Sequence, residues 1–64
     1  MFGRTRITLD KTLLAKVRRY AHVAGYSSAE EFVTHVLEKE LAHVDGAASD
    51  EEVKKRLQGL GYLG

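Results

Sequence analysis

Arginine and threonine alternate with apolar residues near the start of the chain, in the stretch RTRITLD (4–10). Successive side chains of a β-strand point to opposite faces, so Arg4, Arg6 and Thr8 would lie together on one face. A guanidinium group can bind a phosphate, or the O6 and N7 atoms of guanine, through two hydrogen bonds, and a threonine can reach a base edge or a thymine methyl group. The spacing therefore indicates either a polyanion-binding face or an ordinary solvated one.

The predicted strand needs a partner, because an unpaired strand leaves a row of backbone N–H and C=O groups without hydrogen bonds. No second strand is apparent in the sequence. We therefore expect residues 4–9 to pair with the same residues of a second copy, forming a two-stranded antiparallel ribbon with Thr5, Ile7 and Leu9 facing inward. A ribbon of this width fits the major groove of B-DNA.

Two helices are expected directly behind the strand. Asp10 is a suitable N-cap for the first helix, which covers residues 11–24 and ends at Gly25. Ser27 and Ser28 are each followed three residues later by a glutamate, which is the capping-box pattern, so the second helix begins after one or the other. Its apolar stripe then continues for about four turns.

A third, shorter helix is predicted after the linker DGAAS (45–49). Ser49 and Glu52 form another capping box. Glu52 and Arg56 stand four residues apart in the order that favours an ion pair on a helix surface. Gly59 and Gly61 are expected to end this helix.

The chain has 64 residues, no cysteine and a net charge of +1. Disulfides and thiolate metal sites are excluded, and a domain this small usually needs a partner to bury enough surface. Charge is segregated: residues 1–26 carry +5, residues 27–52 carry −7 and the remainder carries +3. No segment has the length or apolar character of a membrane span or a signal peptide, so we expect a cytoplasmic protein. Because a chain this small needs a partner and has no cysteine, we also expect it to form a homodimer.

The order and spacing of these features resemble the ribbon-helix-helix family of DNA-binding proteins, the MetJ/Arc/CopG type. The resemblance covers RTRITLDKTLLAKVRRYAHVAGYSSAEEFVTHVLEKEL, about residues 4–41. It implies a mostly α-helical fold with one N-terminal strand, assembled as an intertwined homodimer around a two-stranded antiparallel ribbon. It also implies that Arg4, Arg6 and Thr8 contact bases in the major groove of double-stranded DNA.

The resemblance further implies a phosphate contact at the start of the second helix, by Ser27, Ser28 and Ala29. A helix N-terminus offers free N–H groups to an anion, and the same serines can also act simply as caps. Glu30 and Glu31 depart from this picture, since carboxylates beside the phosphate would repel it.

The C-terminal stretch lies outside the resemblance and carries an apolar stripe. This stripe either folds back onto the rest of the molecule or binds a small partner protein, as antitoxin tails bind their toxins. Its members are Val53, Leu57, Leu60, Tyr62 and Leu63. We therefore expect a ribbon-helix-helix domain over residues 1–45, and a linker with a short amphipathic helix over residues 46–64.

The predicted function is sequence-specific binding of double-stranded DNA by a repressor or autoregulator. The alternatives are an antitoxin-type regulator and a dimeric adaptor that does not touch DNA. His22, His35 and His43 lack metal-ligand spacing, and no residue pattern indicates an enzyme or a cofactor. Arg18 and Arg19 can touch flanking phosphates or lie on solvated helix surface.

Overall fold

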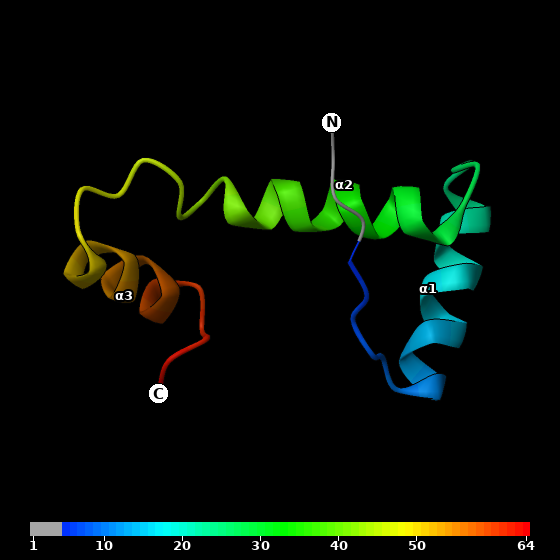
Figure 1. Ribbon diagram of the computed structural model, residues 1–64, viewed down its shortest axis with the longest axis horizontal. Helices are drawn as coiled ribbons and strands as arrows, with labels where there is room; N and C mark the ends of the chain where they lie inside the picture. The colour runs from blue at the N-terminus through cyan, green and yellow to red at the C-terminus, as the bar shows by residue number, and fades with distance from the viewer. Residues whose placement is uncertain (1–4) are drawn as a thin grey trace. The chain divides into compact units, whose positions relative to one another are not determined.

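A computed structural model of the chain describes residues 5–64. Three α-helices follow one another along the chain (Figure 1): α1 at Lys11–Val23, α2 at Ala29–Leu41 and α3 at Asp50–Gly59. The chain forms two compact units, Met1–Val33 and Thr34–Gly64, and α2 contributes residues to both. The predicted domain boundary at residue 45 stays a prediction. No helix in the described part of the chain is long and apolar enough to span a membrane.

The predicted fold class is wrong. None of residues 5–64 belongs to a β-strand, so a ribbon-helix-helix fold built on an N-terminal strand does not describe this protein. The alternation in residues 4–10 expresses only a preference for extended backbone, whereas a strand also requires a hydrogen-bonded neighbour. The described residues contain no second extended segment that could serve as this neighbour, and residues 5–10 enter α1 without regular structure.

Helix α1 begins and ends as the sequence predicts. The Asp10 carboxylate accepts a hydrogen bond from the Leu13 N–H at 3.1 Å, which satisfies one of the free donors at the helix start. At the other end Gly25 has a φ of 85°, a left-handed conformation that costs glycine little. The Tyr26 N–H then reaches back to the Ala21 carbonyl at 2.9 Å, closing a Schellman motif.

The turn between α1 and α2 is held by polar and aromatic contacts. The Ser28 hydroxyl accepts from the Glu31 N–H at 3.1 Å, so Ser28 is the cap at the start of α2. The Ser27 hydroxyl donates to the Glu31 carboxylate at 2.8 Å. The rings of Tyr26 and Phe32 meet edge to face with their centroids 5.2 Å apart. These contacts fix the first turn of α2 against the end of α1.

Very little of the described chain is buried. Ala21, on α1, is the only buried residue among residues 5–64, with 3% of its surface exposed. Large apolar side chains remain accessible in both units. Ile7 in the first unit is 78% exposed, and Leu41 in the second unit is 54% exposed. Since apolar burial is the main favourable term in folding, local capping alone gives these helices a small stability margin.

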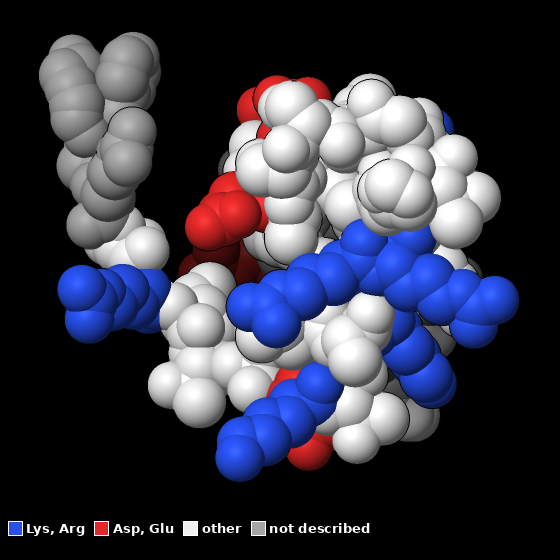
Figure 2. Space-filling view, turned by 90° about the vertical axis from the view of Figure 1, so that its right-hand side faces the viewer, with Lys and Arg blue, Asp and Glu red and all other residues white. Residues whose placement is uncertain are grey.

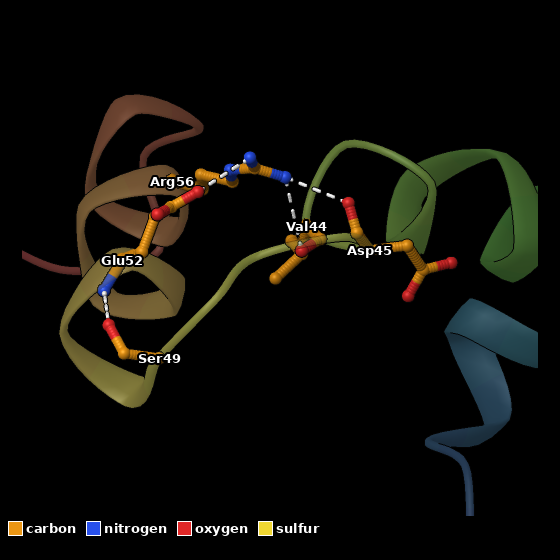
Figure 3. Close-up of polar contacts among 5 residues, drawn as sticks. All are labelled: Val44, Asp45, Ser49, Glu52 and Arg56. Atoms are coloured by element: carbon orange, nitrogen blue, oxygen red, sulfur yellow. Dashed lines mark hydrogen bonds and ion pairs between the residues drawn. The ribbon is translucent and has the colours of Figure 1, made fainter.

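The second unit is held by Arg56, which connects α3 to the turn that follows α2 (Figure 3). Its Nη1 atom donates to the Asp45 carbonyl at 2.8 Å and to the Val44 carbonyl at 3.3 Å. Its Nη2 atom forms the predicted ion pair with Glu52 at 2.7 Å. Ser49 caps α3 by accepting from the Glu52 N–H at 3.3 Å, also as predicted. One guanidinium group therefore serves the carbonyl oxygens after α2 and the first turn of α3 together.

The C-terminal segment folds back within the second unit. The Tyr62 hydroxyl donates to the Glu40 carboxylate of α2 at 2.6 Å, a contact between residues 22 positions apart. Gly61, with a φ of 92°, turns the chain so that the Tyr62 N–H bonds the Leu57 carbonyl at 2.9 Å. The end of the chain is thus attached to both α2 and α3.

Candidate nucleic-acid interface

Helix α1 separates its cationic and apolar residues onto opposite faces. At about 100° per residue, its four Lys and Arg residues fall within about 160° of the helix circumference. We name this surface the basic face; it comprises Lys11, Lys16, Arg18 and Arg19. The apolar face on the other side comprises Leu13, Leu14, Val17, Tyr20 and Ala21. The division leaves the basic face exposed along the whole helix.

No acidic residue interrupts the basic face, because α1 contains neither Asp nor Glu. In Figure 2 the Lys and Arg side chains, in blue, gather across the middle of the surface seen from the side of α1. Cations that share a face and lack acidic partners repel one another, and binding a polyanion relieves that repulsion. This surface carries four of the six Lys and Arg residues of the first unit.

A shallow hollow of about 180 Å³ adjoins the basic face where the chain turns into α2. It is lined by Arg18, Ala21, His22, Tyr26, Ser27, Ser28 and Ala29. All three residues predicted to hold a phosphate are therefore beside one guanidinium of the basic face. Free N–H groups at a helix start, together with a nearby arginine, form a favourable environment for an anion.

Glu30 and Glu31 lie in the first turn of α2, as the sequence predicts. The hydrogen bond from Ser27 holds the Glu31 carboxylate near the start of the helix. Both serine hydroxyls thus already take part in hydrogen bonds within the turn, Ser28 as an acceptor and Ser27 as a donor. A phosphate in the hollow would therefore bind against the repulsion of at least one carboxylate.

The predicted base contacts lie before α1. Arg4 is outside the described residues, while Arg6 and Thr8 are exposed in the segment that leads into the helix. No ladder of strand hydrogen bonds aligns these two side chains, so the structure does not place them on a common strand face. Their role as base contacts stays a prediction.

The residues predicted to bind a partner protein lie in the second unit. Val53 and Leu57 of α3 are half-buried, whereas Leu60, Tyr62 and Leu63 are exposed. Leu57 and Tyr62 help to line an apolar groove described below. Within residues 5–64, no group of three or more His, Asp or Glu side chains could hold a metal ion.

Two contacts in the second unit were not anticipated from the sequence. The bond between Tyr62 and Glu40 and the bonds from Arg56 to the Val44 and Asp45 carbonyls join residues 11 to 22 positions apart. The spacing of Glu52 and Arg56 predicted their ion pair, but no local pattern indicates that the same guanidinium reaches beyond its own helix.

The hydroxyl of Tyr62 should titrate at higher pH than an ordinary tyrosine. Its hydrogen bond to Glu40 is the main cause, with partial desolvation and the negative charge of Glu40 adding to it, and together they raise the pKa above the usual 10. The bond therefore contributes to stability at neutral pH and is lost as the pH rises through this raised pKa. In a titration followed by tyrosinate absorbance, Tyr62→Phe should remove a component whose pKa lies above 10. Removal of a component at or below 10 would contradict this assignment.

Comparison with models of known protein families, with characterised proteins and with solved structures finds no match to this chain.

Proposed function

We propose that this protein binds double-stranded DNA, with the basic face of α1 along the phosphate backbone. The observation that carries the proposal is the grouping of four cations on one face of a helix that contains no acidic residue. Phosphate contacts of this kind supply most of the affinity of a protein for nonspecific DNA. The hollow beside Arg18 adds a position for one phosphate at the start of α2.

Sequence preference would come from the exposed segment that precedes α1. Arg6 and Thr8 carry the donor groups and the methyl group that read base edges in the major groove. Phosphate contacts along α1 would position this segment beside the groove. We infer a regulatory role for a protein of this kind, as a repressor or autoregulator in the cytoplasm.

The proposal is tested by fluorescence anisotropy with the full chain and a labelled random duplex at several salt concentrations. Neutralising four phosphates should give a slope of about −3.6 in a plot of log K against log salt concentration. Unlabelled duplexes of different sequence then compete for the protein, and an unequal competition would identify a preferred sequence. Absence of binding at low salt would refute the proposal and favour the adaptor alternative.

Removing the negative charge of Glu31 should strengthen DNA binding. Glu31→Gln keeps the size of the side chain and its ability to accept from Ser27, while the repulsion of a phosphate in the hollow disappears. We expect the Kd for random duplex to fall about threefold at low salt, since one exposed charge contributes less than about 1 kcal/mol. Glu38→Gln, which makes the same charge change in the second unit, is the matched control. Equal effects of the two variants would show that only net charge matters.

A further inference from the structure

The second unit contains an apolar groove of about 280 Å³ between α2, α3 and the C-terminal segment. It is lined by Leu37, Glu40, Leu41, Val44, Leu57 and Tyr62. Its one carboxylate, that of Glu40, already accepts the Tyr62 hydroxyl at 2.6 Å. The remaining lining presents aliphatic side chains, so the groove suits an apolar occupant.

The groove is open to solvent. Leu37 and Leu41 stand one turn apart on the same face of α2, and their side chains are 48% and 54% exposed. Adjacent exposed leucines in a concave surface are typical of an interaction site, because their hydration is unfavourable. A chain with a single buried residue among those described has a large free-energy gain available from covering this groove.

The first unit carries a matching surface. On the apolar face of α1, Leu13 and Tyr20 are 48% and 50% exposed. The two units also differ in sign of charge: Met1–Val33 has six Lys and Arg against three Asp and Glu, whereas Thr34–Gly64 has four against six. The helix face and the groove match in their apolar character, and the opposite net charges of the two units favour the approach of the first unit of one copy to the second unit of another.

We propose that the groove of one copy receives the apolar face of α1 from a second copy. Each chain has one such face and one such groove, so two chains can exchange them reciprocally about a two-fold axis and form a closed dimer. The pairing covers exposed apolar residues of both units and leaves the basic face of α1 accessible. The inference depends on burial and charge and does not require that the protein bind DNA.

Two variants of the full chain test this pairing by complementation. Tyr20→Glu disables the apolar face of α1, and Leu41→Glu disables the groove; both positions are half exposed, so neither change introduces a charge into a packed core. Sedimentation equilibrium should give the mass of two chains for the wild type and of one chain for each variant. An equimolar mixture should recover the mass of two chains, because it retains one intact face and one intact groove.

The other outcomes overturn the proposal. A Tyr20→Glu variant that still dimerises would show that the apolar face of α1 is not used, and a dimeric Leu41→Glu variant would show that the groove is not used. A wild type with the mass of one chain, or with a mass above two, would exclude the closed pair, as would failure of the mixture to dimerise. If a variant unfolds alone, helical circular dichroism restored by mixing supports the proposal and its continued absence overturns it.

Discussion

The double substitution Lys16→Glu and Arg19→Glu is expected to weaken binding to random duplex DNA about a hundredfold at low salt, through loss of two phosphate contacts and added repulsion. Both residues lie on the basic face of α1. The slope of log K against log salt concentration should also become shallower by about 1.8, since each lost contact accounts for about 0.9. Fluorescence anisotropy over a salt series measures both quantities.

Lys54→Glu with Lys55→Glu is the matched control. It changes the net charge by the same amount on a helix of similar length, α3, in the second unit. We expect it to leave the salt slope unchanged and to alter the Kd by no more than a few fold, because these lysines are not part of the basic face. Equal losses of DNA affinity in the two double variants would show that binding depends only on total charge, and the assignment of the interface to α1 would be wrong.

Arg56→Ala is expected to destabilise the second unit by about 1–2 kcal/mol, because it removes hydrogen bonds made by a charged group. This value includes a reduction for solvent screening, since the Arg56 side chain is one-third exposed. The guanidinium bonds two carbonyls in the turn that follows α2 and one carboxylate in α3. Without the guanidinium group, the carbonyls of Val44 and Asp45 must accept hydrogen bonds from water instead. Urea unfolding followed by circular dichroism, at one fixed protein concentration, measures the loss.

Two further variants separate the geometry of Arg56 from its charge. Arg56→Lys keeps the charge but lacks the planar group with several donors, so it should recover only part of the lost stability. Lys55→Ala removes an exposed cation from the same helix and should change the free energy of unfolding by less than about 0.5 kcal/mol. Full recovery by lysine would show that charge near the end of α2 suffices, and the hydrogen bonds would then contribute little.

Local signals in the sequence predicted the helices well. Asp10, Ser28 and Ser49 each accept a hydrogen bond from the N–H three residues later, and each helix start lies directly behind them. Gly25 and Gly61 adopt the positive φ that the ends of α1 and α3 require. These features depend on neighbours within four residues, so the sequence around each one contains the information needed to predict it.

The predicted strand depended on a different kind of information. Alternation in residues 4–10 specifies which side chains would share a face, but pairing depends on a partner that the local sequence cannot provide. The same limit applies to the site. Ser27 and Ser28 were predicted at the start of α2 from their capping pattern, and their position beside Arg18 in one hollow became apparent only from the turn at Gly25.

The contacts of the C-terminal segment were beyond sequence patterns for a related reason. Tyr62 and Glu40 are 22 residues apart, and neither residue type has a preference that identifies the other. The apolar stripe of α3 indicated that this segment would be covered. It did not indicate whether the rest of the molecule or a partner protein would cover it. The chain turn at Gly61 answers part of that question, because it brings Tyr62 to the groove.

Ala21 is the only buried residue among those described, and this has a consequence for hydrogen exchange. Backbone amides in helices that open locally exchange with solvent at rates set by the free energy of opening, which is small where few side chains are packed. Isolated helices of 10 to 13 residues, the lengths found here, are marginal in water. Strong protection of amides in α1 or α2 would therefore indicate that contacts with another molecule stabilise these helices. If that molecule is a second copy, the protection should decline steadily as the protein is diluted.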